Sequence, residues 1–395
     1  MSKSSDTKIP TLTEYLKDES SAIKLLTKNR TTVPSLIASL HAQFSLENDV
    51  FIRKNAANYL LSAIKKATKN QFENSPEKVS EIVNFLLLKI INDSHLLWGE
   101  ILESLYFIFS KMEKLVHVDH YSEVMKTVLE NVHAQSLSKR LYLFKLILIL
   151  IKHHPCTAKK LGSNFIEKYI EFADEEKDPE TLKVIWNLTI LINKINVNPG
   201  PLLPDFWEIC SMYWPIEFKS SPDKAVNNKQ SMKLQLDEVL TSTPLFIVEN
   251  YSAILDKLSS DGFSAKICAL DLFIKMCEKY PEQAYKNRNS EDSIESAIFS
   301  SIKMLLIDHS DKEFESVKEA TLECLTKCMI IFEDRFNLEF LKNLLKNEVV
   351  GLKKIDEGLV GEILVAAGKA DFGMVIGVIE RCENLRIFFG VTSFF

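Results

Sequence analysis

Glycine is scarce in this chain: the 395 residues include 11, less than half of what an average usage of about 7% predicts. Parallel α/β folds and phosphate-binding loops depend on glycine turns, so this scarcity favours helices joined by polar loops. The formal net charge of −6 gives no general attraction to nucleic acid phosphates or anionic lipid. We therefore expect neither direct nucleic-acid binding nor membrane binding.

Long hydrophobic runs are also lacking. The longest, from Leu141 to Ile151, is interrupted by Lys145 and falls far short of the ~20 residues that a membrane span needs. The first residues lead into no apolar segment of a signal peptide. Seven cysteines, an odd number in a long chain, do not form a disulfide framework. A reduced compartment fits better, and we expect the protein in the nucleus and the cytoplasm.

Helical periodicity extends from Thr11 to about Ala367, over a chain that is too long for one compact core unless it is elongated. The clearest helix follows Asp49, where small and apolar residues recur every three or four positions and charged or polar residues occupy the other face. The recurring residues are Ile52, Ala56, Tyr59, Leu60, Ala63 and Ala67. This pattern is typical of the inner helix of a HEAT repeat.

Related patterns recur at a nearly constant distance. Taking Arg53, Trp98, Arg140 and Lys183 as markers of the repeat phase, the steps are 45, 42 and 43 residues, within the roughly 40–47 of HEAT units. Less regular units follow at 264–270 and 317–322. We expect the partner helices at 77–91, 120–132, 250–258, 290–306 and 338–345. The sequence thus predicts an all-α HEAT/armadillo-like α-solenoid of stacked helical hairpins, in which each pair buries the face that its neighbour leaves uncovered.

Cysteine and histidine clusters raise the question of a metal or cluster site. Cys324 and Cys328 lie four residues apart on one helix face, but the same face continues with apolar residues, so we interpret both as core side chains. The groups 117–120 and 153–156 contain histidines at helix boundaries, where such side chains cap helices. A zinc or iron–sulfur site needs about four closely spaced ligands. We therefore expect no metal and no cofactor.

No enzyme motif is present: the chain has no Gly-x-Ser-x-Gly elbow, no phosphate-binding loop and no His-Glu-x-x-His. We expect no catalytic residues and no enzymatic activity. Lys65, Lys66 and Lys69 form a small basic patch. A solvated helix face is the favoured interpretation, and a phosphate-binding surface is the alternative.

Two stretches stand out as individual. Asp178 and Pro179 have the character of an N-cap and a first helical residue, which would start a helix carrying Leu182, Ile185 and Trp186 on one face. Further on, Tyr213 and Trp214 precede a proline and a polar loop. Such an aromatic pair either packs a loop onto the array or forms an exposed binding anchor. We favour packing.

These stretches carry a family resemblance. The segment 175–179, the passage 206–218 with Tyr213-Trp214-Pro215-Ile216-Glu217-Phe218, and the segments 236–243 and 255–260 are similar in order and spacing to the amino-terminal domain of the MMS-nineteen family. The resemblance covers about residues 15–290. The family typically has glycine where this chain has Glu175, and phenylalanine is common at the position of Trp214.

The resemblance implies a HEAT-repeat scaffold of the cytosolic iron–sulfur protein assembly (CIA) targeting complex, linked by name to nucleotide excision repair. Such a scaffold would bind CIA subunits and apo iron–sulfur client proteins, such as DNA helicases and polymerases, for insertion of a 4Fe–4S cluster. The candidate partner-binding or family-motif residues are Asp178, Pro179, Tyr213, Trp214, Pro215, Ile216 and Phe218.

The resemblance also organises the domains. We expect a disordered tail at 1–10, the family's amino-terminal repeat domain at 11–290 with a polar loop at about 214–230, further HEAT-like repeats at 291–368, and an atypical apolar tail at 369–395. Family members run to about a thousand residues, and their carboxyl-terminal docking repeats have no counterpart here. We therefore interpret the tail as a truncation point.

Two alternatives belong to other classes. A HEAT-type nuclear transport receptor often lines its concave face with a Trp-x-x-x-Asn ladder, whereas here Leu102 follows Trp98 and Ile190 follows Trp186 at that spacing. A metalloenzyme or cluster carrier would require several cysteines to converge on a metal. We favour the protein-interaction scaffold over both.

Overall fold

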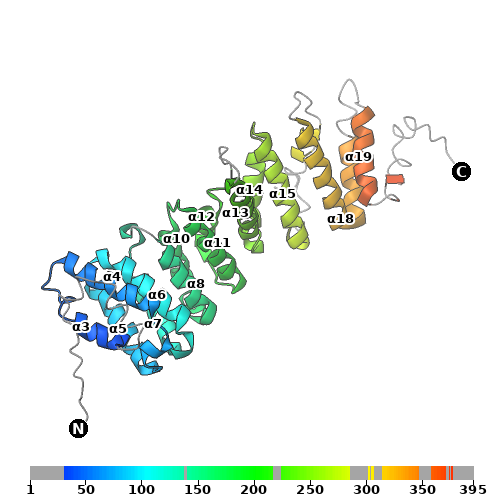
Figure 1. The fold of residues 1–395 in the computed structure, drawn as a ribbon. Helices are drawn as coiled ribbons and strands as arrows, with labels where there is room; N and C mark the ends of the chain where they lie inside the picture. Colours follow the sequence, from blue (N-terminus) through cyan, green and yellow to red (C-terminus); the bar gives the residue numbers. More distant parts are fainter. Residues whose placement is uncertain are drawn as a thin grey trace, which may run out of the picture. The chain divides into compact units, whose positions relative to one another are not determined.

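The computed structural model describes residues 31–137, 140–216, 224–284, 301–302, 304–306, 314–346, 357–370, 373 and 375–376. Contacts between residues divide the chain into two compact units, Met1–Cys210 and Ser211–Phe395. The family domain predicted at 11–290 extends over both. Throughout the described ranges the regular secondary structure is helical and contains no strand, which confirms the predicted all-α fold (Figure 1).

The first unit is a succession of helices joined by short turns. Its α-helices are α3 (Val33–Leu40), α4 (Val50–Lys66), α5 (Pro76–Asn92), α6 (Trp98–Lys111), α7 (Val118–Asn131), α8 (Leu141–His153), α9 (Pro155–Leu161), α10 (Ser163–Ala173), α11 (Pro179–Lys194) and most of α12 (Leu203–Ser211). Short 3-10 helices lie between them: η1 (Lys69–Phe72), η2 (His95–Leu97), η3 (Glu113–Leu115), η4 (Ala134–Ser136) and η5 (Gly200–Leu202).

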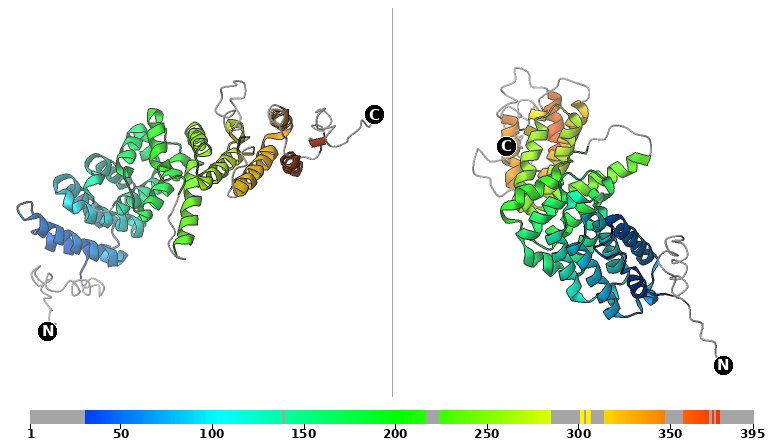
Figure 2. Two further views of the ribbon diagram at one scale, coloured as in Figure 1. Left: turned by 90° about the horizontal axis from the view of Figure 1, so that it is seen from above. Right: turned by 90° about the vertical axis from the view of Figure 1, so that its left-hand side faces the viewer.

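Four of these helices form one layer. Helix α4 packs against α6, α6 against α8, and α8 against α11, while α5 packs against α6 and α7 on the partner side. Figure 2 shows the stacked helices of this unit from two further directions. Each helix of the layer carries a phase marker at or near its start: Arg53, Trp98, Arg140 and Lys183. The repeat phase predicted for the first four units is thus confirmed.

Local sequence signals set the helix starts. The Asp49 side chain accepts a hydrogen bond of 2.7 Å from the Phe51 amide at the start of α4. The Ser75 hydroxyl accepts one of 3.2 Å from Lys78 at the start of α5. Between α9 and α10 the backbone of Gly162 has a φ of 55°, a conformation that glycine adopts without steric cost. A sharp turn therefore joins these two helices.

Large aromatic side chains fill the core at the end of the first unit. Phe144, Phe165, Tyr169, Trp186 and Phe206 are fully buried. The hydroxyl of Tyr169 contacts the carbonyl oxygen of Ile185 at 2.9 Å and the Thr189 hydroxyl at 2.8 Å. The polar tip of this buried ring is therefore satisfied, which limits the cost of burying it.

Helix α8 contains the longest apolar run of the sequence, Leu141 to Ile151. Leu143, Phe144, Leu146, Ile147, Leu150 and Ile151 are all buried. No single described helix is long and apolar enough to cross a membrane, and α8 and α9 meet the length and composition criteria only as a pair bent by 102°.

The second unit repeats the same type of packing. Its described helices are α13 (Lys224–Leu240), η6 (Pro244–Phe246), α14 (Ile247–Leu258), α15 (Phe263–Lys279), α16 (Pro281–Ala284), α18 (Phe314–Lys346) and α19 (Glu357–Ala370). Helix α14 packs against α15, α15 against α18, and α18 against α19.

Two sequence predictions about this unit need correction. The polar loop expected at 214–230 is shorter, because α13 begins at Lys224; lysine, alanine and glutamine there are good helix formers. The separate partner helix expected at 338–345 is part of the single helix α18. No glycine or proline lies between Phe314 and Lys346 to end that helix. The tail at 1–10 and most of 290–306 lie outside the described residues.

Candidate protein-binding surface and family motif

The acidic turn between α10 and α11 begins the passage that carries the family resemblance. Asp178 Oδ2 accepts hydrogen bonds from the Thr181 amide at 2.9 Å and from the Thr181 hydroxyl at 2.7 Å. Pro179 is the first residue of α11, where the missing N–H has no partner to lose. The helix start predicted from these two residues is confirmed. Both are exposed.

Arg140, at the start of α8, holds this turn. One guanidinium nitrogen, Nη1, donates to the carbonyl oxygens of Phe172, at 3.1 Å, and Asp174. The Arg140 Nε lies 3.9 Å from Glu176 Oε2. The other carboxylate oxygen of Glu176 accepts two hydrogen bonds of 2.8 Å from the backbone amides that follow it. The turn is therefore fixed by a cation from the preceding inner helix and by its own carboxylate.

Glu175 adopts a left-handed backbone conformation in this turn, with a φ of 54°. A residue with a β-carbon pays a steric cost there that glycine does not. The geometry supplies a physical reason for the glycine that is typical of the family at this position.

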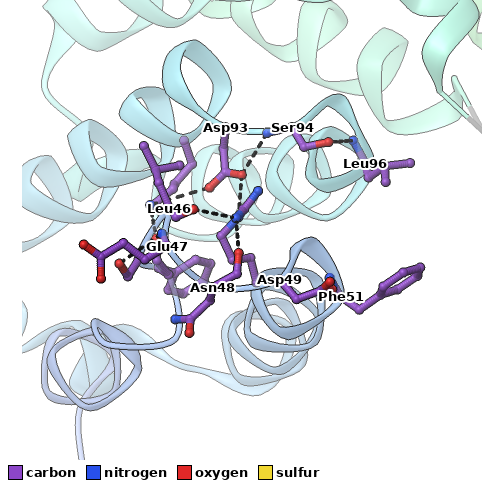
Figure 3. Close-up of polar contacts among 12 residues, drawn as sticks. Leu46, Glu47, Asn48, Asp49, Phe51, Asp93, Ser94 and Leu96 are labelled. Atoms are coloured by element: carbon purple, nitrogen blue, oxygen red, sulfur yellow. Dashed lines mark hydrogen bonds and ion pairs between the residues drawn. The ribbon is translucent and has the colours of Figure 1, made fainter.

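Arg53 anchors a turn in a similar way two repeats earlier, in α4. The Arg53 Nε donates to Asp93 Oδ1 at 2.9 Å, and its Nη1 donates to the carbonyl oxygens of Leu46 and Asn48 (Figure 3). Asp93 Oδ1 also accepts from the next backbone amide at 2.8 Å, and Lys89 Nζ lies 3.7 Å from Oδ2. The Asp93 side chain is 0% exposed and that of Arg53 11%. This ion pair ties α4 to the turn that precedes α6.

The second unit joins α13 to α15 with lysines. Lys275 Nζ lies 2.6 Å from Asp237 Oδ2, and Lys233 Nζ lies 3.1 Å from Asp271 Oδ2. The residues of each pair are 38 apart, about one repeat. Asp237 is almost completely buried, and this burial raises its pKa in spite of the lysines nearby.

The aromatic turn that follows α12 is mostly covered. Trp214 is 8% exposed, and its backbone amide donates to the Ser211 carbonyl at 2.7 Å. Tyr213, Pro215 and Ile216 are half-buried. The Trp214 ring is therefore not an exposed anchor, in agreement with the packing interpretation. Phe218 lies outside the described residues. Partner binding by Tyr213, Trp214, Pro215 and Ile216 stays a prediction.

The cysteines of the second unit gather inside it. Cys324 and Cys328 on α18 are buried, as predicted, and the Cys328 thiol hydrogen-bonds with those of Cys324 and Cys277 of α15. Burial raises the pKa of the Cys277 thiol, and the hydrogen bond that the Cys324 thiol donates to Cys328, together with burial, raises the pKa of Cys324. Among the described residues, no group of three histidines, cysteines or carboxylates has the arrangement needed to hold a metal ion.

The histidines at helix boundaries have local polar partners. His117 is the N-cap residue of α7, and its ring nitrogen accepts from the Asp119 amide at 3.4 Å. His154 precedes α9, and its ring lies 2.7 Å from the Thr157 hydroxyl and within 3.4 Å of the exposed Cys156 sulfur. The capping role expected for His117 is confirmed.

Sequence reasoning identified Arg53 and Arg140 only as phase markers and missed their partners, Asp93 and Glu176. A detectable signal exists, because each arginine at the start of one inner helix is followed, about one repeat later, by a carboxylate just before the next inner helix. It also missed the Phe107 ring, whose centroid lies 5.6 Å from Lys65 Nζ, and the neighbouring rings of Tyr106 and Tyr142. Those rings lie on different helices, and their proximity depends on packing.

The chain is similar in sequence to a known protein family. The MMS19 amino-terminal family model, described as Dos2-interacting transcription regulator of RNA-Pol-II, matches residues 37–303. The MMS19 nucleotide excision repair protein homolog of Xenopus tropicalis is 27% identical over 256 residues, 64% of this chain and 24% of that protein. The human homolog of the same name is 28% identical over 232 residues, 57% of this chain and 22% of that protein.

A DNA repair/transcription protein of Saccharomyces cerevisiae is 28% identical over 256 residues, 62% of this chain and 24% of that protein. The chain thus spans about a quarter of the length of these relatives. Because the family model covers more than half of its residues, the chain belongs to the MMS19 family, whose amino-terminal domain it carries.

Proposed function

We propose that this chain is a non-catalytic scaffold of the CIA targeting complex, which recognises apo client proteins of DNA repair, replication and transcription for insertion of a 4Fe–4S cluster. The observation that carries the proposal is membership of the MMS19 family. The relatives' names, nucleotide excision repair protein homolog and DNA repair/transcription protein, fit clients that act on DNA. In this proposal the cluster is cargo that passes to the client.

The helical stack supports a scaffold role. In the first unit, α4, α6, α8 and α11 form a continuous layer, and each added helix extends the surface that the layer presents. Repeat arrays of this kind bind partners along extended surfaces. We propose residence in both nucleus and cytoplasm, because clients that act on DNA work in the nucleus, whereas this assembly pathway is cytosolic.

Affinity purification tests the proposal. The chain is tagged and expressed in its own cells, purified without oxygen, and its partners are quantified by mass spectrometry against the tag alone. We expect enrichment of CIA subunits and of iron–sulfur helicases or polymerases. Absence of both groups would contradict the proposal. Binding to Ran-GTP, measured with the same purified chain, would instead favour a nuclear transport receptor.

A further inference from the structure

An aromatic–lysine cluster lies on the layer of inner helices in the first unit. It consists of three half-buried rings and three lysines. These side chains belong to helices α4, α6 and α8, and the three helices stack side by side (Figure 1). Its members are Tyr106, Phe107, Tyr142, Lys65, Lys111 and Lys145. Lys65 also belongs to the basic patch of Lys65, Lys66 and Lys69, which borders this cluster.

The three rings form a continuous aromatic surface across two helices. The centroid of Tyr106 lies 5.2 Å from that of Phe107 and 5.4 Å from that of Tyr142, and the Phe107 and Tyr142 centroids are 6.0 Å apart. These separations are typical of interacting aromatic pairs. Because the rings are only partly buried, they keep apolar surface available to a ligand.

The lysines hold their ammonium groups against these rings. Lys65 and Lys111 lie over the same ring, that of Phe107, at 5.6 and 5.1 Å from its centroid. Lys145 lies 5.1 Å from the Tyr142 centroid and 6.0 Å from that of Tyr106. Three ammonium groups that share one aromatic surface raise the local positive potential. Each contact with a ring contributes only about 1 kcal/mol at exposed sites and leaves the charge of the lysine in place.

One carboxylate within the cluster offsets part of this charge. Glu103 Oε1 lies 2.6 Å from Lys65 Nζ. Burial, followed by the hydrogen bond with Glu103, raises the pKa of Tyr142 to about 12, and Glu180 on α11 adds to the effect. Lys111 and Lys145 form no ion pair with any described carboxylate; the Lys111 ammonium donates to the Lys65 carbonyl oxygen. The cluster is therefore positively charged in a chain of net charge −6.

We propose that this cluster binds an acidic peptide segment, whose carboxylates pair with Lys111 and Lys145 while an apolar side chain packs against the rings. The two ligand groups match the two available features, ammonium groups that form no ion pair with a described carboxylate and a partly exposed aromatic surface. A nucleic acid strand fits less well. The ammonium groups lie over the ring faces on which successive bases would stack, so a strand of bases loses a contact that a single peptide side chain at the ring edges keeps.

This surface is independent of cluster delivery. The proposed function concerns the proteins with which the chain assembles. The aromatic–lysine cluster instead predicts the chemical class of peptide that one face of the first unit binds. Purified chain and synthetic probes can test it whether or not CIA subunits are captured from cells.

Fluorescence anisotropy with purified full-length chain tests the proposal. The probe is a short fluorescein-labelled peptide rich in glutamate with one central phenylalanine. The neutral control replaces each glutamate with glutamine, and oligothymidine of equal length supplies the nucleic-acid arm. The variant is the double substitution Lys111→Gln and Lys145→Gln. Its matched control is Lys159→Gln and Lys160→Gln, which removes the same charge from exposed lysines at the end of α9.

We expect the acidic peptide to bind more tightly than the neutral peptide and oligothymidine, with an affinity that falls as salt is added. The Lys111/Lys145 variant should lose about tenfold in affinity or more, and the Lys159/Lys160 variant less than about twofold, with circular dichroism unchanged in both. Equal losses in the two variants, no preference for the acidic peptide, or tighter binding of oligothymidine would overturn the proposal.

Discussion

Asp93 in the first unit and Asp237 in the second are both buried carboxylates paired with a cation about one repeat away, but their surroundings differ. Asp93 receives the Arg53 guanidinium at 2.9 Å and a backbone amide at 2.8 Å, and Lys89 lies 3.7 Å away. Asp237 receives the Lys275 ammonium at 2.6 Å, yet burial still raises its pKa.

The difference between the surroundings of Asp93 and Asp237 follows from the chemistry of their cations, Arg53 and Lys275. The planar guanidinium of Arg53 pairs with the carboxylate and also donates to the carbonyl oxygens of Leu46 and Asn48. An ammonium is a compact point charge without this fork. Arginine therefore fixes two turns of the first unit at once, whereas the lysine in the second unit leaves a carboxylate that remains costly to ionise.

Replacing Arg53 should produce the largest effect. Arg53→Met leaves Asp93 buried without its main cation and two carbonyl oxygens, those of Leu46 and Asn48, without the guanidinium donor. We expect a loss of about 3–5 kcal/mol in the free energy of unfolding of the first unit, since removal of one partner of a buried ion pair costs this much. Urea denaturation followed by circular dichroism measures it.

The neighbouring residue supplies the control. Lys54 lies 3.8 Å from Glu100 with 38% of its side chain exposed, so Lys54→Met should cost at most about 1 kcal/mol. Equal losses for Arg53→Met and Lys54→Met would remove the distinction between a buried clamp and a surface pair.

The second arginine should matter less. Arg140→Met removes hydrogen bonds to the Phe172 and Asp174 carbonyls, but Glu176 keeps the two backbone amides that it accepts from. We expect a loss of about 1.5–3 kcal/mol, which is what hydrogen bonds to charged groups contribute, because the bond to Phe172 is part-buried and the bond to Asp174 is exposed. The same urea titration tests the order, and a loss larger than that of Arg53→Met would refute it.

Glu175 offers a stabilising change in the same turn. Its φ of 54° costs roughly 1–2 kcal/mol for a residue with a β-carbon. Glycine removes this cost but loses more chain entropy on folding, about 0.5–1 kcal/mol. Glu175→Gly should therefore raise the free energy of unfolding by up to about 1 kcal/mol. Glu175→Ala, which keeps the β-carbon, is the matched control, and an equal gain from it would contradict the backbone explanation.

A pH series gives the smallest effect and addresses the second unit. Because burial raises the pKa of Asp237, the folded chain binds a proton at a higher pH than the unfolded chain. Stability is therefore lost as pH rises from the ordinary value of about 4 through the raised pKa. Asp237→Asn has no such proton. The Tm of the wild type relative to this variant should fall over that interval, and a constant difference would be inconsistent with the raised pKa.

The sequence was sufficient for the repeat architecture because apolar spacing and caps are local. Arg53, Trp98, Arg140 and Lys183 identified four stacked helices correctly. Helix ends in the second unit were predicted less well. Polar composition at 224–230 suggested a loop, although the lysines, alanine and glutamine there are good helix formers, and the helix predicted at 338–345 is part of α18.

Interactions across the repeats were not predictable in this way. The spacing of Arg53 and Asp93 is a signal for their pairing, but establishing the contact, like placing Lys111 over Phe107 beside Tyr142, requires the rotation of each helix about its axis and its offset from the next. The spacing of apolar residues determines neither the rotation nor the offset. For the candidate binding residues, the family resemblance located the passage 213–216, and only the packed structure showed that Trp214 is covered.

A double-mutant cycle on Arg53 and Asp93 tests most directly whether buried ion pairs between successive repeats hold this stack together. The free energy of unfolding is measured for wild type, Arg53→Met, Asp93→Leu and the double variant. We predict a coupling energy of at least about 2 kcal/mol and a double variant more stable than Arg53→Met alone, since the buried charge is gone. Additive losses would contradict the account.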